Sequence, residues 1–108
     1  FKGKHYTEYV EEVKKLKRRG ENDKAIQLLL DLLDPVENES SIRRQPPMPG
    51  YYEDLAILYR KEKDYVSEVK ILERYAKLSQ KYGWEGKPKL LERLAKAQAL
   101  ANKSASNT

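Results

Sequence analysis

Apolar residues recur every three or four positions along five stretches of the chain, which is the spacing of one face of an α-helix. The stretches are separated by residues that commonly stop or start helices, namely Gly20, the prolines of segment 46–49, and Gly83. The pattern predicts an all-α chain of about five helices. They cover about residues 5–19, a stretch ending near residue 37, 51–61, a stretch ending near residue 81, and 88–103, followed by a frayed tail over 104–108.

Several side chains are placed to begin or disturb these helices. Asn22 or Asp23 can cap the second helix and Asp64 the fourth, because short side-chain oxygens accept the free amide hydrogens of a first turn. Pro88 suits the first position of the fifth helix. Pro35 lies within the last turns of the second helix, where we expect it to cause a kink or fraying.

Segment 39–50 interrupts the helical pattern. It is polar and contains three prolines, so we predict a surface loop whose only candidates for burial are Ile42 and Met48. Arg43 and Arg44 form a basic pair within it and are secondary candidates for binding a partner, because long loops often carry function.

Composition limits the possible functions. The chain has 108 residues, which is the size of one small domain, over residues 1–103, and 36% of them are charged with a net charge of +5. It has no cysteine, and no apolar run approaches the roughly 20 residues that span a bilayer. We therefore expect no membrane contact and, from the missing cysteines, an intracellular, cytoplasmic location. Because the chain opens at Phe1, we interpret it as a piece of a longer protein.

Residues suited to catalysis are scarce. His5 is the only histidine, and its place before the first helix predicts a surface position. Neighbouring carboxylates such as Glu11 and Glu12 point in different directions on a helix and share no site. The sequence contains no glycine-rich phosphate loop, nucleophile elbow or metal-binding helix motif. We predict no catalytic, cofactor-binding or metal-binding residues, and hence no enzyme.

One predicted helix carries an aromatic, a leucine, a small residue and a tyrosine on a single face, at Tyr52, Leu55, Ala56 and Tyr59. The small residue lets a second helix approach closely. This pattern resembles the tetratricopeptide repeat, a helix-turn-helix unit used mainly as a protein-binding scaffold. The resemblance implies two degenerate repeats, over about 6–37 and 51–81, and a capping helix over 88–103.

The two units share an internal register. Leu16 and Ala25 are nine residues apart, as are Tyr59 and Glu68. Tyr9 and Tyr52 are 43 residues apart, whereas the usual period is about 34, so an insertion is expected in segment 39–50. Glu68 stands where this family usually has alanine, and we expect looser helix packing there. A generic bundle of helical hairpins is the alternative to the repeat interpretation.

The resemblance also implies a binding site, because the first helix of each repeat lines the inner groove of such proteins. By register this candidate groove consists of Val10, Lys14, Lys17, Glu53, Ile57 and Arg60. Its lysines and arginine suit an acidic peptide or a terminal carboxylate. Neighbouring parts of a longer protein could instead cover the groove.

Other surfaces and functions stay open. Trp84 is expected to fill the gap between the last two helices, with a partner contact as the alternative, and Tyr51 is expected to be exposed. The basic cluster 14–19, together with Arg43 and Arg44, could bind nucleic acid. A protein-interaction scaffold is the function that the sequence favours, ahead of a nucleic-acid module or a structural spacer within a larger protein.

Overall fold

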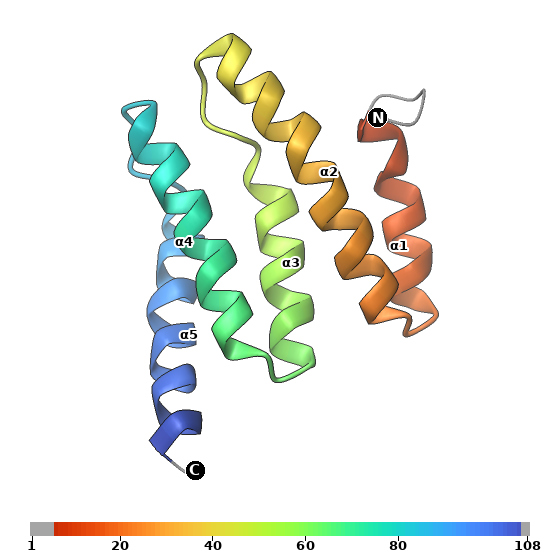
Figure 1. Ribbon diagram of the computed structural model, residues 1–108, viewed down its shortest axis with the longest axis vertical. Coiled ribbons are helices and arrows are strands. Elements are labelled where there is room, and N and C mark those ends of the chain that lie inside the picture. The colour runs from red at the N-terminus through yellow and green to blue at the C-terminus, as the bar shows by residue number, and fades with distance from the viewer. Residues whose placement is uncertain (1–5, 107–108) are drawn as a thin grey trace.

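The computed structural model describes residues 6–106, which are all-α (Figure 1). A 3-10 helix, η1 (Tyr6–Tyr9), leads into α1 (Val10–Arg18), which is followed by α2 (Asn22–Arg43), α3 (Pro49–Lys61), α4 (Tyr65–Lys81) and α5 (Pro88–Ser106). The described residues form no strand. The predicted all-α class with about five helices is confirmed. His5 lies outside the described residues.

Successive helices run in opposite directions and form a flat body of 45 × 37 × 19 Å (Figure 1). α1 packs against α2, α2 against α3, and α4 against both α3 and α5. The α2–α3 connection and the α4–α5 connection therefore lie at the same end of the molecule, and the α1–α2 and α3–α4 turns lie at the other.

The first four α-helices end in the same kind of turn. A residue with a positive φ angle follows each helix, and the next amide donates a hydrogen bond to a carbonyl five residues earlier, which satisfies the last turn. The residues with positive φ are Gly20, Arg44, Lys63 and Gly83. Two of these four positions are occupied by glycine, the residue that adopts this conformation most readily.

α2 is longer than predicted. It continues to Arg43, so residues 39–43 are helical and only 44–48 connect α2 to α3. Within this extension Glu39 and Arg43 form an ion pair at 2.9 Å, and Ser40 is buried. These interactions stabilise an extra turn in a polar stretch that sequence pattern alone assigned to a loop. Ile42 and Met48, the segment's candidates for burial, are exposed.

The other expectations for helix ends have mixed outcomes. Asp64 caps α4 by accepting a hydrogen bond from the Ser67 amide at 3.1 Å, as predicted. Pro88 begins α5, also as predicted. The cap of α2 was predicted wrongly: Glu21 occupies that position without a side-chain capping bond, and Asn22 instead bonds Glu62 at 2.8 Å. Pro35 lies inside α2 without ending it, because Leu33 and Val36 beside it are anchored in the core.

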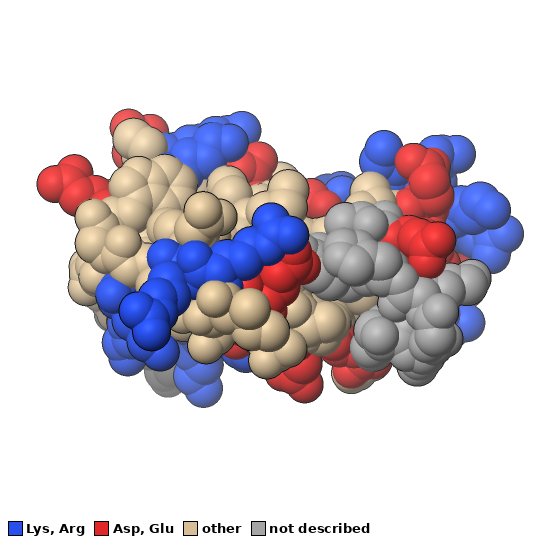
Figure 2. Space-filling model, turned by 90° about the horizontal axis from the view of Figure 1, so that it is seen from above, with Lys and Arg blue, Asp and Glu red and all other residues tan. Residues whose placement is uncertain are grey.

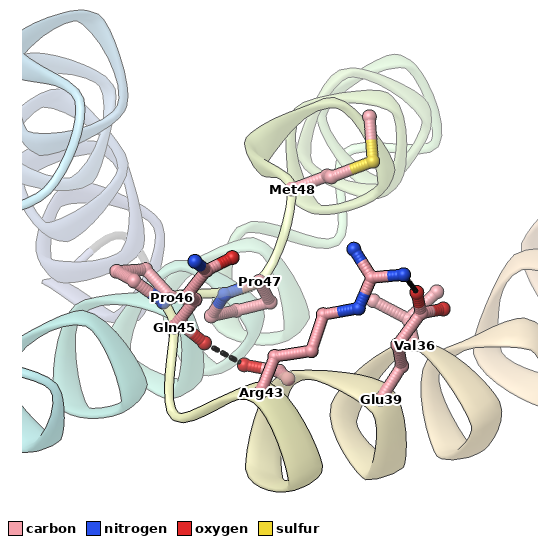
Figure 3. Close-up of a pocket in the computed structure, with 8 residues that line it drawn as sticks. Val36, Glu39, Arg43, Gln45, Pro46, Pro47 and Met48 are labelled. Atoms are coloured by element: carbon pink, nitrogen blue, oxygen red, sulfur yellow. Dashed lines mark hydrogen bonds and ion pairs between the residues drawn. The ribbon is translucent and has the colours of Figure 1, made fainter.

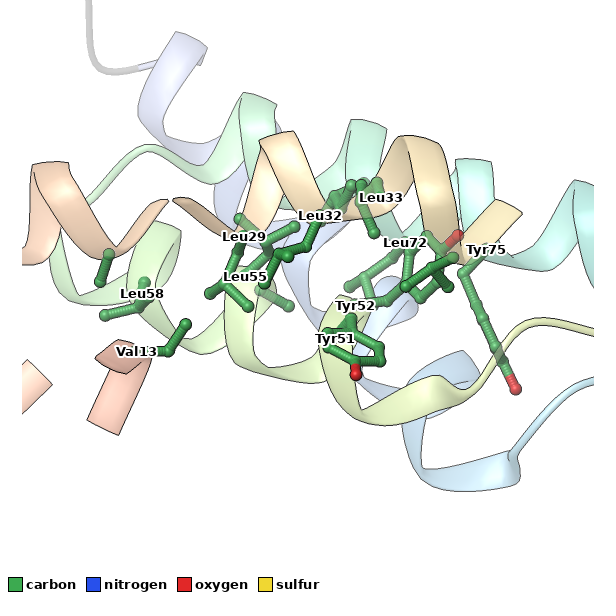
Figure 4. Packing of buried hydrophobic residues seen from close by; sticks show 14 of the residues in the cluster. Val13, Leu29, Leu32, Leu33, Tyr51, Tyr52, Leu55, Leu58, Leu72 and Tyr75 are labelled. Atoms are coloured by element: carbon green, nitrogen blue, oxygen red, sulfur yellow. The ribbon is translucent and has the colours of Figure 1, made fainter. Parts of the chain in front are cut away.

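The core runs between the helices as one continuous cluster (Figure 4). Near its centre the rings of Tyr52 and Tyr75 lie 5.5 Å apart at a tilt of 48°. Ala56 has no exposed surface, as its role at a helix crossing predicts. Tyr51 was expected to be exposed but is buried. Burial first, and then the charge of Glu39 on the extended part of α2, raise the pKa of Tyr51.

Glu68 was expected to loosen the packing, but it is buried completely, with 0% of its surface exposed. Arg60 of α3 approaches it with two nitrogens, Nε at 3.0 Å from Oε1 and Nη2 at 2.8 Å from Oε2. Arg93 of α5 approaches Oε2 at 3.2 Å. A buried carboxylate is tolerated only with such partners, so Glu68 joins α3, α4 and α5.

Ala56→Leu tests the helix crossing. The larger side chain has no space at a position with no exposed surface, so we expect the free energy of unfolding to fall by about 1–3 kcal/mol. Urea unfolding followed by circular dichroism measures the change. Val66→Leu enlarges an exposed residue of α4 and should leave stability unchanged. Equal stability of Ala56→Leu and the parent would show that this position is not a close crossing.

Glu68→Gln tests the buried carboxylate. The amide keeps the shape of the side chain but leaves Arg60 and Arg93 without a counter-charge. We therefore expect the free energy of unfolding to fall by about 3 kcal/mol. This is the lower end of the range for broken buried ion pairs, because both arginines keep some exposure. Glu73→Gln is the matched control, since Glu73 is exposed on the same helix and has no ion pair within the described residues. A loss as small as that of the control would remove Glu68 as a structural anchor.

Candidate functional site

The predicted groove is populated by charges that pair within the chain. On α1, Val10 and Lys14 are exposed, and Lys14 lies 3.3 Å from Glu11. Lys17 is only partly exposed and pairs with Asp54 of α3 at 3.4 Å. The two lysines therefore already have carboxylate partners.

The groove residues on α3 are paired in the same way. Glu53 lies 3.3 Å from Lys89 of α5, and Arg60 is held by Glu68. Ile57, which lies between Glu53 and Arg60 along α3, is half-buried. These ion pairs link α3 to α1 on one side and to α5 on the other, and they leave little unpaired positive charge on the predicted floor.

Exposed apolar side chains gather elsewhere. Five large hydrophobic residues are exposed among the described residues, and Ile42, Met48 and Trp84 lie at the end where the α2–α3 and α4–α5 connections meet. Met48 is 59% exposed and Trp84 is 42% exposed. Figure 2 looks onto this end, where uncharged side chains cover a broad area, with both basic and acidic side chains across and beside it.

Met48 and Trp84 line the same hollow. Its lining comes from both connections, and it is a shallow depression, wide open to solvent, with a volume of about 500 Å³. We call this feature the loop-end hollow. It is lined by Gln45, Pro46, Pro47, Met48, Pro49, Tyr82 and Trp84.

A smaller hollow of about 100 Å³ lies on the α2 side of the same connection (Figure 3). It shares residues 45–48 with the loop-end hollow and adds side chains of the last turns of α2, including Val36 and the Glu39–Arg43 ion pair. Segment 45–48 is thus a wall with an indentation on each side.

Both walls of the loop-end hollow are held by hydrogen bonds. On the first wall, the Gln45 amide donates to the Ser40 carbonyl at 3.1 Å, and the Ser40 hydroxyl donates to the Gln45 carbonyl. On the second wall, the Trp84 amide donates to the Ser79 carbonyl at 2.9 Å, and the Lys87 amide donates to the Tyr75 hydroxyl at 2.8 Å. These bonds fix the backbone at Gln45 on the first wall and at Trp84 and Lys87 on the second.

The surroundings of the loop-end hollow are basic. Arg44 precedes Gln45, Lys81 precedes Tyr82, and Lys87 lies three residues after Trp84. None of the three forms an ion pair among residues 6–106. The Lys81 ammonium lies 5.7 Å from the centre of the Tyr82 ring, which places it beside the wall. Glu85 is the only acidic residue in segment 81–89.

A network of polar side chains joins α2, α3 and α4. The Tyr52 hydroxyl of α3 donates a hydrogen bond to the Glu37 carboxylate of α2 at 2.6 Å. Arg74 of α4 donates two hydrogen bonds to the same carboxylate, at 2.7 and 2.8 Å. Burial first, and then its hydrogen bond to Glu37, raise the pKa of Tyr52 well above its usual value. The bond to Glu37 also raises the pKa of Arg74.

Of the residues that the sequence singled out, Trp84 lines the loop-end hollow, and Arg43 and Arg44 precede its first wall in the chain. Arg43, Arg44 and Trp84 were secondary candidates, but Trp84 was expected mainly to fill the gap between the last two helices. Gly86 occupies that place instead, since an added Cβ there would lie 3.3 Å from the Tyr75 ring. Met48, Tyr82 and the prolines also line the hollow, and the sequence analysis did not name them as candidates, although a proline-rich segment with a lone methionine was a usable signal.

Residues 6–106 contain neither a candidate metal site nor a candidate membrane span. No group of three or more histidine, cysteine, aspartate or glutamate side chains there could hold a metal ion. No helix in that part of the chain is both long enough and apolar enough to cross a membrane. Comparisons with models of protein families, with curated proteins and with solved structures found no match to the chain.

The Tyr52–Glu37 contact predicts a dependence of stability on alkaline pH. The folded state holds the Tyr52 proton more tightly than the unfolded state, whose pKa is near 10.0, so this stabilisation is complete below about pH 10 and decreases as the pH rises further. Tyr52→Phe should lower the free energy of unfolding by about 1–2 kcal/mol at pH 7. It should also make this free energy decrease less steeply with pH above pH 10. Urea unfolding across this range measures both.

Tyr65→Phe, on the half-exposed start of α4, is the control and should leave the alkaline slope as it is in the parent. An unchanged slope in Tyr52→Phe would show that the hydroxyl does not keep its proton through the contact with Glu37.

Proposed function

We propose that this chain is a non-catalytic protein-interaction module, built from two helical hairpins of the tetratricopeptide type and a closing helix. The observation that carries the proposal is the joint exposure of Met48 and Trp84 in one hollow with preformed walls. The fit of the sequence to the repeat pattern at Tyr52, Leu55, Ala56 and Tyr59 supports the architecture.

The residue types of the loop-end hollow support protein binding. Tryptophan, tyrosine and methionine are enriched where proteins meet, and large aromatic anchors contribute much of the binding energy. Methionine also adapts its shape to different partners. An apolar hollow with charged surroundings matches the usual plan of an apolar centre and a polar rim.

The predicted groove is a weaker candidate for the same function. A ligand carboxylate would compete with Asp54 for Lys17 and with the buried Glu68 for Arg60. Displacing Glu68 would leave a buried carboxylate without its main partner, which is costly. The free cations of the loop-end hollow need no such exchange.

A nucleic-acid module receives less support from the charges of α1. Lys15 and Arg19 lie around the same shallow surface as Glu8, Glu11 and Glu12. Phosphate binding favours a continuous positive surface, whereas this one alternates in sign.

A capture experiment tests the proposed function. The parent protein and the double variant Met48→Ser, Trp84→Ser are immobilised, and the proteins bound from a cell extract are quantified by mass spectrometry. We expect the double variant to lose specific partners while keeping the parent melting temperature, because both side chains are exposed. Val66→Ser, a change at another exposed apolar residue, should retain them.

The double variant Lys14→Glu, Lys17→Glu locates the binding face in the same experiment. Loss of partners in this variant alone would assign binding to the predicted groove instead of the loop-end hollow. Equal capture by all variants would remove both faces.

A further inference from the structure

We infer that the loop-end hollow takes an acidic peptide segment with an apolar anchor side chain, an assignment that rests on the proposed protein-binding function. The hollow is lined by three prolines, Met48, Tyr82 and Trp84, and Gln45 contributes its only amide side chain. Such a lining accommodates an apolar side chain and offers few polar groups to satisfy a polar one.

The charges near the hollow favour an acidic peptide. The Lys81 ammonium lies beside the Tyr82 wall, and Arg44 and Lys87 belong to the two connections that form the hollow, whereas Glu85 is the one acidic residue of segment 81–89. Aspartate or glutamate beside the anchor would gain these cations without displacing any existing partner. A basic segment would face like charges, which disfavours binding.

The preformed walls favour a short segment. Residues 46, 47 and 49 are prolines, and both ends of the connection are fixed by the turn after α2 and by the start of α3. Trp84 is held at its backbone by Ser79. Little ordering is required on this side, so a few contacts can support binding in the ~micromolar range.

Single-stranded nucleic acid fits the hollow less well. It binds by stacking bases on successive open aromatic faces. Here the Tyr82 ring already has the Lys81 ammonium near its face, and the opposite wall consists of prolines and Met48. Trp84 would be the single exposed stacking surface of the hollow.

A selection experiment tests the inference with the chain as it stands. Random peptides displayed on phage are selected on the parent protein. We expect the selected peptides to combine aspartate or glutamate with leucine or an aromatic residue. A synthetic selected peptide is then titrated while the emission of Trp84, the only tryptophan, is recorded. We expect a blue shift, because the anchor would displace water from the indole.

Matched variants separate charge from folding. Lys81 and Lys61 are the last residues of α4 and α3, and both are exposed. Lys81→Glu should weaken binding of the peptide by about tenfold or more, whereas Lys61→Glu should leave it unchanged. Met48→Ser should also weaken binding of the peptide. All three variants, Lys81→Glu, Lys61→Glu and Met48→Ser, should melt close to the temperature of the parent.

Each other outcome overturns the assignment. Basic or neutral selected peptides, or no selection while captured proteins still depend on Met48 and Trp84, would reject the acidic peptide but keep the proposed function. Failure of both experiments would reject both. A shift of Trp84 emission by oligodeoxythymidylate at the same concentrations would assign the hollow to nucleic acid. A dimer in sedimentation that Met48→Ser dissociates would assign it to a second copy.

Discussion

The buried carboxylate of Glu68 is the constraint on which the packing of α3, α4 and α5 depends. A charge with no exposed surface must be matched inside the protein, and here two guanidinium groups from two other helices meet at one carboxylate. This requirement limits how far the three helices can slide or rotate against each other. A hydrophobic residue could give equal stability, as buried ion pairs often add none, but it would not demand a single arrangement of Arg60 and Arg93.

The two central tyrosines connect this packed unit to both walls of the loop-end hollow. Tyr52 and Tyr75 are in contact in the core, yet their hydroxyl groups reach in different directions. Tyr52 bonds Glu37 and so holds α2, whose last turn leads into the first wall. Tyr75 accepts the amide hydrogen of Lys87 and so holds the connection that carries Trp84. The geometry of the surface therefore follows from contacts inside the core.

The features of this fold that can be predicted from sequence are those that depend on residues close together in the chain. The number and type of the helices, the Asp64 cap, the Pro88 start and the burial of Ala56 all follow from spacing and from the chemistry of single residues. The errors concern contacts between distant parts of the chain. The end of α2, the burial of Tyr51 and the partners of Glu68 depend on which helices become neighbours, and periodicity carries no such information. For the same reason Met48 and Trp84, 36 residues apart, could not be assigned to one hollow.

The predicted groove and the loop-end hollow both have cations nearby, and they differ mainly in whether carboxylates of the chain pair with these cations. Lys17 and Lys89 each face an acidic residue on α3, so their charges help to hold neighbouring helices together. Lys81 and Lys87 have the same chemistry, but no carboxylate in the described part of the chain lies within ion-pair distance of them. A cation that is paired across a helix interface must lose that partner before it can bind another, whereas an unpaired one loses only water. This difference in pairing is the reason that we propose the loop-end hollow, with its exposed Met48 and Trp84, as the binding surface in preference to the predicted groove.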